Sequence, residues 1–117
     1  MPGEKLYRIT YTRSAVIDIG DKIDYLIFQY NDSELAEIWY RRLVDFLKCN
    51  LNSFPYKYPV YDRTKYNKHT VRYLTYRNDI VFFYVDEVAS TVYIIAVCTK
   101  GRDTEKHIRL LKVNRDE

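Results

Sequence analysis

Hydrophobic and polar positions alternate at the start of the chain and then change to helical spacing. From Leu6 to Tyr11, the side chains of residues 6, 8 and 10 alternate with those of residues 7, 9 and 11, and β-forming residues dominate the run. This alternation predicts a short strand. This spacing is followed by apolar residues that recur every three or four positions: Val16, Ile19, Ile23, Leu26, Ile27 and Tyr30. The second pattern predicts an amphipathic helix of about four turns, with Thr12 or Ser14 as its N-cap.

A second helical pattern follows after a short polar break at residues 31–33. Its apolar stripe consists of Leu35, Ala36, Trp39, Leu43, Phe46 and Leu47. Glu34 is spaced to complete a capping box from Asn31, and Phe54-Pro55 is expected to end the helix because a residue before proline avoids helical geometry. A three-residue connection predicts that the two helices pack as an antiparallel hairpin, with Trp39 in the core between them.

The second half of the chain is predicted to form a sheet. Residues 55–69 contain two prolines and many tyrosines without a sustained period, and we expect an irregular surface loop there. Three strand patterns follow at 71–76, 80–85 and 91–98, joined by short turns that favour antiparallel pairing. The apolar run 80–85 is expected at the sheet centre, covered on both faces. Asp103 is the expected cap of a short terminal helix that carries Ile108 and Leu111.

These elements predict one α+β domain over residues 1–117, in the order β-α-α-β-β-β-α, with a helical hairpin on one face of a small antiparallel sheet. The length suits a single core, and 16% aromatic residues argue against a disordered chain. The first five residues carry no apolar stretch, so we expect no secretory signal, and no run is long enough to span a membrane.

Cysteine and histidine usage predicts a cytoplasmic protein without a cofactor. Cys49 and Cys98 lie far apart, there is no CxxC motif, and the two histidines, His69 and His107, are not clustered. Free thiols in a reducing compartment are the simplest interpretation, and we expect neither a structural zinc ion nor another cofactor.

Positive charge is concentrated in one segment, Pro55 to Arg77. It holds six tyrosines, one acid (Asp62) and six cations: Lys57, Arg63, Lys65, Lys68, Arg72 and Arg77. Six cations and one acid give a net charge of +5, whereas the whole chain is +3, so the remainder sums to −2. A basic aromatic segment on a nearly neutral body is typical of contact with a polyanion.

The ordered set of patterns resembles the RelE/ParE superfamily of bacterial toxins from type II toxin–antitoxin modules, over residues 6 to about 110. The runs that carry the resemblance are YRITYTRSA (7–15), LNSFP (51–55), VRYL (71–74), IVFFYVD (80–86), VYIIAV (92–97) and the exit TKGRD (99–103). The resemblance implies a small cytoplasmic toxin held inactive by a cognate antitoxin. RelE-like members cut messenger RNA on the ribosome, whereas ParE-like members poison DNA gyrase.

The resemblance also implies a set of catalytic residues for the RelE-like activity. Lys65 and Lys68 correspond to cations of the family's loop, Arg72 to one on its second strand, and Lys100 and Arg102 to the exit of its last strand. No tyrosine follows Tyr93, so His107 is the candidate for the C-terminal acid or base, with His69 as a further candidate for proton transfer. An arginine can neutralise the phosphate charge through two hydrogen bonds at once.

The remaining cations and tyrosines of the basic segment are candidates for nucleic-acid binding. Lys57, Arg63, Lys65, Lys68 and Arg77 can contact phosphates, and Tyr61 or Tyr66 can stack on bases. The structural alternatives are that the tyrosines pack over the sheet edge, that Arg72 pairs with a carboxylate across the sheet, and that the histidines are solvated.

Three functions therefore stay open from the sequence. They are a metal-independent, ribosome-dependent mRNA endonuclease, a non-enzymatic gyrase inhibitor acting through the hairpin and the C-terminal segment, and an inactive module that only binds antitoxin. In each case we expect an acidic or amphipathic antitoxin segment that covers the basic and apolar surfaces and folds on binding.

Overall fold

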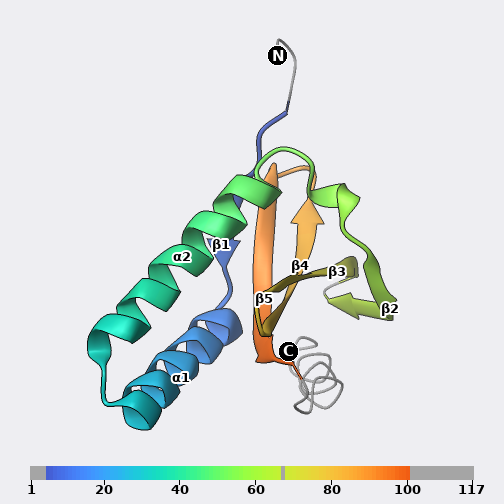
Figure 1. Cartoon of the computed structure of the whole chain (residues 1–117). Coiled ribbons are helices and arrows are strands. Elements are labelled where there is room, and N and C mark those ends of the chain that lie inside the picture. The colour runs from blue at the N-terminus through green and yellow to red at the C-terminus, as the bar shows by residue number, and fades with distance from the viewer. Residues whose placement is uncertain (1–4, 67, 101–117) are drawn as a thin grey trace.

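The helical hairpin is the first large feature of the computed structural model, which describes residues 5–66 and 68–100, without the side chains of residues 62–64. Strand β1 (Arg8–Tyr11) leads into α1 (Arg13–Tyr30), and α2 (Ser33–Leu51) runs back toward the sheet (Figure 1). Thr12 caps α1 by accepting a hydrogen bond from the Ala15 amide at 3.3 Å. The antiparallel hairpin and this N-cap were both expected from the sequence.

The turn between the helices differs from the predicted capping box. Asp32, not Asn31, caps α2, because its carboxylate accepts hydrogen bonds from the amides of Glu34 and Leu35 at 3.0 and 3.2 Å. Asn31 ends α1 in the left-handed conformation, with φ 50°. Asparagine tolerates this conformation better than most residues, which makes it a common helix terminator.

Within the described residues, the sheet has five strands in the order β1-β5-β4-β3-β2. The later strands are β2 (Val60–Tyr66), β3 (His69–Tyr76), β4 (Asp79–Asp86) and β5 (Thr91–Thr99). Strands β2 to β5 pair antiparallel, but β1 pairs parallel with β5, with Arg8 opposite Thr91. The order of the described elements fits the predicted α+β class, and the predicted C-terminal helix lies outside the described residues.

The prediction of an irregular loop over residues 55–69 is wrong for most of that range. It contains a 3₁₀ turn, η1 (Pro55–Lys57), and strand β2, which pairs with β3 from Tyr66 opposite His69 to Val60 opposite Arg72. The register shifts between Val60 and Lys65. This irregularity breaks the two-residue period, which explains why the strand was not visible in the pattern of the sequence.

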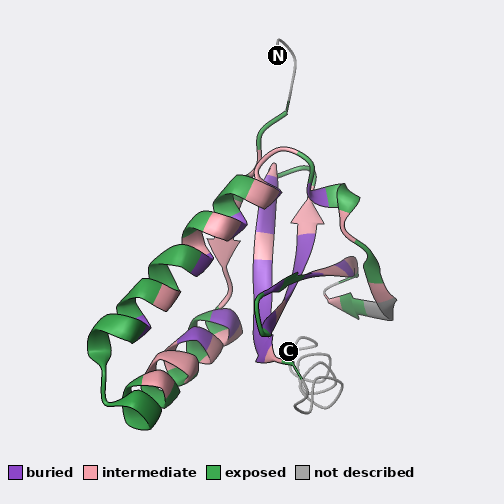
Figure 2. Ribbon diagram, in the orientation of Figure 1, coloured by how far each residue is buried: buried purple, intermediate pink, exposed green. Residues whose placement is uncertain are grey.

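Both faces of the sheet carry an apolar cluster. Figure 2 shows that most of β4 and β5 is buried. On the helix face, α1 and α2 pack against β4 and β5 through Ala15, Ile19, Leu43, Leu47, Phe83 and Ile94. The opposite face holds Val71, Phe82, Tyr84, Ile95, Ala96 and Cys98. Phe82 and Phe83 are both fully buried on opposite faces of β4, which confirms that this strand is central and covered on both sides.

Candidate nucleic-acid interface

The cations and tyrosines of the basic segment lie on η1, β2 and β3, at one edge of the sheet. Because successive side chains of a strand point to opposite faces, β3 divides its candidates between the two sides. Arg72 faces the helix side, where it lies opposite Phe83, while His69 shares the other side with Val71. The structure therefore does not bring Arg72 and His69 to one place.

Arg72 supports the backbone of η1 and of the residue that follows it. Its Nη1 donates hydrogen bonds to the carbonyl oxygens of Tyr58 at 2.7 Å and Tyr56 at 3.3 Å. The guanidinium carbon lies 5.1 Å from the centre of the Tyr56 ring, within range of a cation–π contact. Arg72 thus fixes the turn at the start of the basic segment, and its hydrogen-bond partners among the described residues are carbonyl groups.

Aromatic rings on the opposite face form a continuous stack. The Tyr84 ring lies 4.4 Å from His69, 5.0 Å from Tyr93 and 5.7 Å from Tyr66, with interplanar angles of 17°, 21° and 26°. Tyr61 meets Phe82 edge-on at 4.9 Å between ring centres. Tyr61 and Tyr66, the two candidates for base stacking, are both half-buried against this cluster. Each already has an aromatic partner.

The remaining cations of the segment are spread along its length. Lys57 lies over the Tyr58 ring at 5.3 Å and Arg77 over the Tyr76 ring at 5.7 Å. Lys65 donates to the Thr70 hydroxyl at 3.0 Å, and Lys68 is exposed with a left-handed backbone, φ 69°. The side chain of Arg63 is outside the description. These cations form a band along the sheet edge and do not converge on one pocket.

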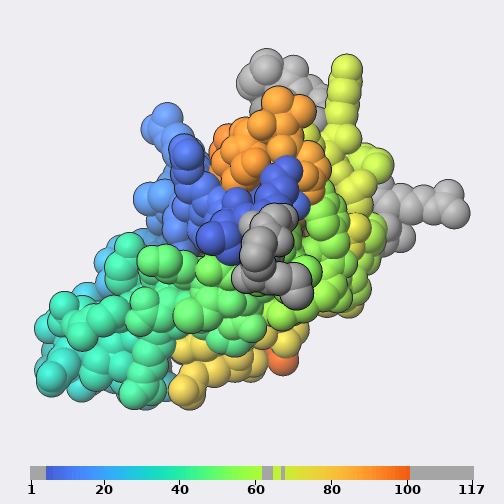
Figure 3. Space-filling model, turned by 90° about the horizontal axis from the view of Figure 1, so that it is seen from above, coloured from blue at the N-terminus to red at the C-terminus, as the bar shows by residue number. Residues whose placement is uncertain are grey.

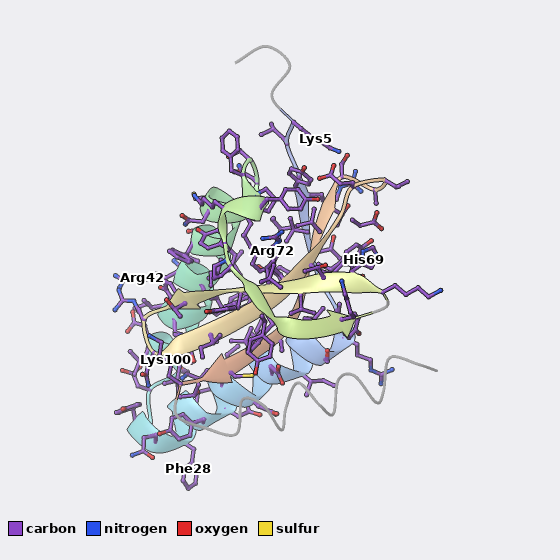
Figure 4. All side chains as sticks on the ribbon, turned by 90° about the vertical axis from the view of Figure 1, so that its right-hand side faces the viewer. Lys5, Phe28, Arg42, His69, Arg72 and Lys100 are labelled. Carbon is purple, nitrogen blue, oxygen red and sulfur yellow. The ribbon has the colours of Figure 1, made fainter. Side chains whose placement is uncertain are left out.

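Lys100, the described candidate from the exit of β5, lies at the other end of β3 from His69. Its amide donates to the Asn78 carbonyl at 2.8 Å, directly after β3 ends, while His69 is the first residue of that strand. Eight residues of strand span roughly 23 Å. Figure 4 shows the two labelled side chains far apart, with Arg72 between them. The other two C-terminal candidates, Arg102 and His107, lie outside the described residues.

A buried carboxylate joins the β5 exit to the helical hairpin. Asp79 accepts hydrogen bonds from Lys22 Nζ at 3.2 Å, Trp39 Nε1 at 3.2 Å and the Thr99 hydroxyl at 3.4 Å. Trp39 is only partly buried, and its indole reaches across to the sheet, which is a role that the pattern of the sequence did not indicate. Asp79 thereby accepts hydrogen bonds from donors on three different elements.

A cleft of about 570 Å³ lies between α1 and the adjoining ends of β4 and β5. Its charged lining residues are Asp18, Asp21, Lys22 and Asp79, so it carries more negative than positive groups and does not suit a polyanion. Burial, helped by Asp18 and Asp79, raises the pKa of the Cys98 thiol on its wall to about 12. The thiol therefore stays protonated and is a poor nucleophile.

A second carboxylate, that of Glu87, accepts hydrogen bonds from several donors at the end of the sheet where β4 turns into β5. No pattern in the sequence indicated it. It lies in the β4–β5 turn and accepts hydrogen bonds from the Tyr7 hydroxyl at 2.6 Å and the Tyr56 hydroxyl at 2.5 Å, together with Lys5 Nζ. Seen from above, the blue N-terminal segment adjoins the orange β4–β5 turn (Figure 3). The partners are more than thirty residues away in the chain, so no local pattern indicates this contact.

The hydrogen bonds of this cluster shift the pKa values of its members. The bonds from Lys5, Tyr56 and Tyr7 lower the pKa of Glu87 to about 2. Desolvation, followed by the bond to Glu87 and its negative charge, raises the pKa of Tyr7 to about 12, and the pKa of Tyr56 rises in the same way despite the nearby charge of Arg72. The cluster therefore holds an ionised carboxylate among neutral phenols and a cation over the physiological pH range.

Neither a metal-binding cluster nor a membrane-spanning helix is found in the part of the chain that the structure describes. No group of three or more histidine, cysteine, aspartate or glutamate side chains there is arranged to hold a metal ion. Among the described residues, no helix is long and apolar enough to cross a membrane.

Comparison with known proteins identifies the fold. No protein-family model and no curated protein matches the sequence. Solved structures do match. One is the chromosomal ParDE toxin–antitoxin system from P. aeruginosa, which matches with 18% identity and a TM-score of 0.62. The match covers 80% of this chain and 95% of the matched chain. The RelBE2 toxin–antitoxin complex from Mycobacterium tuberculosis matches with 14% identity, a TM-score of 0.55 and coverage of 84% and 95%. The chain has the RelE/ParE-type toxin fold.

Proposed function

We propose that this chain is a growth-inhibiting toxin of a type II toxin–antitoxin module that acts in the cytoplasm as a ribosome-dependent mRNA endonuclease. The observation that carries the proposal is the band of cations and tyrosines along η1, β2 and β3, on a chain with the toxin fold. A single-stranded polynucleotide is bound by such a surface through its phosphates and bases, with little demand for a deep pocket.

The proposed reaction is attack of a ribose 2′-oxygen on the adjacent phosphorus, with rupture of the bond to the 5′-oxygen. A base accepts the 2′-hydroxyl proton, an acid protonates the departing 5′-oxygen, and the negative charge that builds up on the phosphate needs a cation. Arg72 is the proposed cation, and Lys65 and Lys68 are proposed to assist it by contacting the RNA strand. Because His69 faces the other side of the sheet, we assign proton transfer to His107, with Lys100 and Arg102 as further phosphate contacts.

The test is induced expression with separate measurements of translation and of chromosomal breaks. Wild type should stop translation and leave cut messenger RNA, and Arg72→Ala should slow cleavage by about 10²-fold or more, as expected for loss of a group that stabilises developing charge. Arg42→Ala, which removes an exposed cation from α2 (Figure 4), is the matched control and should keep full toxicity. Circular dichroism of both variants separates loss of chemistry from loss of fold.

A gyrase inhibitor is the second candidate, because Arg72, His69 and Lys100 do not converge and the ParDE system is among the structural matches. It would act by binding, without a catalytic centre. Breaks in DNA with continuing translation would support this candidate and reject the nuclease. Normal growth on induction would leave only antitoxin binding.

The proposed partner is an antitoxin whose acidic or amphipathic segment covers the basic band and the apolar tip of the hairpin, where Phe28 is 88% exposed. ParDE and RelBE2 are toxin–antitoxin assemblies, which supports such a partner here. Co-expression with the neighbouring open reading frame followed by native mass spectrometry tests this, and recovery of free monomer alone would count against it.

A further inference from the structure

Glu87 occupies a cluster of donors that come from two segments of the chain, both far from it in sequence. The N-terminal segment supplies Lys5 and Tyr7, η1 supplies Tyr56, and the β4–β5 turn brings the carboxylate to them. One carboxylate oxygen faces the Lys5 ammonium, and the other accepts both phenolic hydroxyl groups. Lys5 also donates to the Glu87 carbonyl oxygen at 3.2 Å.

A second cation lies directly behind this cluster. Arg72 is fixed 5.1 Å from the centre of the Tyr56 ring by its hydrogen bonds to the carbonyls of Tyr56 and Tyr58. Two cations and one carboxylate leave a net charge of +1 with Glu87 in place and +2 without it. The low pKa of Glu87 is consistent with surroundings that favour a negative charge.

The present occupant of the cluster, the Glu87 carboxylate, is open to solvent. The Glu87 side chain is 48% exposed, and the next residue, Val88, is 99% exposed at the tip of the turn. The turn itself is closed by the bond from the Ser90 amide to the Glu87 carbonyl and by the bond from the Ala89 amide to the Asp86 carboxylate, and neither involves the Glu87 carboxylate. Exposed ion pairs contribute little because water screens them, so this carboxylate can be replaced by another anion.

We propose that Lys5, Tyr7 and Tyr56, backed by Arg72, form a phosphate-binding site for a single-stranded polynucleotide, which Glu87 fills in the free protein and leaves when the polynucleotide binds. A phosphodiester offers two oxygens to the same donors. Tyr56 belongs to η1, after which the basic segment continues through β2 and β3. This phosphate-binding site rests on and extends the proposed function, since Arg72 belongs both to the proposed catalytic residues and to this site. Binding of RNA to the site can be measured independently of toxicity.

The experiment measures binding of a short single-stranded RNA to the purified full chain by fluorescence anisotropy over a range of salt concentrations. Glu87→Ala should tighten binding, because the polynucleotide no longer has to displace the carboxylate. The slope of log K against log salt should change little, because wild type makes the same phosphate contact once Glu87 has left. Glu87→Gln, which keeps the size of the side chain, should also tighten binding. Glu34→Ala removes an equal charge from an exposed position on α2 and should tighten binding clearly less.

A second substitution identifies the donors. In the Glu87→Ala background, Lys5→Ala should weaken binding and lower the slope by about 0.7, the value of one phosphate contact on a single strand, while Lys48→Ala, which removes an exposed cation from α2, should have a smaller effect. An unchanged affinity in both Glu87 variants, or equal effects of the two lysine variants, overturns the proposal. A gain in affinity for a polyglutamate peptide but not for RNA also overturns it. Absence of translation arrest alongside tighter RNA binding in the Glu87 variants would reject the proposed function and leave this site standing.

Discussion

Asp79 and Glu87 lie at opposite ends of β4, and they show how burial changes what a carboxylate does. Asp79 is 2% exposed and accepts hydrogen bonds from Lys22, Trp39 and Thr99, which belong to three different elements. Glu87 has a similar set of donors, but water reaches it from the open side. The buried carboxylate cannot leave without stranding its partners, whereas the exposed one can exchange with solvent ions. Asp79 therefore supports the structure, whereas the contacts of Glu87 can be replaced.

The largest expected effect is on the buried carboxylate. Asp79→Ala leaves the Lys22 ammonium and the Trp39 indole without their acceptor, and we expect the free energy of unfolding to fall by about 3 kcal/mol. Urea unfolding followed by circular dichroism measures this loss. Asp24→Ala, at an exposed position on α1, should change stability by less than about 0.5 kcal/mol. Equal effects of the two variants would mean that burial of Asp79 is unimportant.

The next effect concerns a single donor of the same cluster. Trp39→Phe keeps most of the ring but removes the Nε1 hydrogen bond to Asp79, and a bond to a charged group contributes about 2 kcal/mol. We expect an intermediate loss of stability in the same urea assay. In the Asp79→Ala background, Trp39→Phe should cost clearly less, since its acceptor is already gone. Fully additive losses would contradict a direct bond.

The exposed carboxylate should show its contribution mainly as a dependence on pH. The pKa of Glu87 is lowered from 4.5 to about 2, so the contribution of its ionised form is present above pH 4.5 and is lost as the pH falls toward 2. Unfolding midpoints of wild type and Glu87→Gln should differ modestly near pH 7 and converge near pH 2. Added salt should shrink the difference at pH 7. A difference that persists at pH 2 or in high salt would contradict this assignment.

The smallest effect is a change in the titration of one phenol. Since desolvation and the bond to Glu87 both raise the pKa of Tyr7 to about 12, Glu87→Gln should lower that pKa part of the way toward 10. Difference absorbance between each protein and its Tyr7→Phe version isolates this residue from the other tyrosines. An unchanged pKa would mean that desolvation alone accounts for the shift.

Features that depend on local periodicity were predictable from the sequence. The helical hairpin follows from apolar spacing within each helix, and the central place of β4 follows from an apolar run that needs cover on both faces. The three later strands were likewise found close to their observed bounds. The proposed site residues stay predictions, although the structure shows how far apart the described ones lie.

Features that depend on partners distant in sequence were not predictable. Strand β2 has a register shift against β3 and no clean alternation, so only its pairing reveals it. Asp79 looked like an ordinary turn residue, because nothing nearby shows that Lys22 and Trp39 reach it from the helices. Glu87 meets Tyr7 across eighty positions, and no spacing rule relates them.

The parallel pairing of β1 with β5 has a consequence for synthesis. Strand β5 (Thr91–Thr99) lies between β1 (Arg8–Tyr11) and β4 in the sheet. It is also the last of the described strands to leave the ribosome. Until it emerges, β1 has no neighbour in the sheet and α1 lacks much of the surface on which it packs. Contacts between such distant segments form slowly, so the sheet stays incomplete until β5 has been translated. The apolar face of α1 that packs against β5 is exposed during this interval.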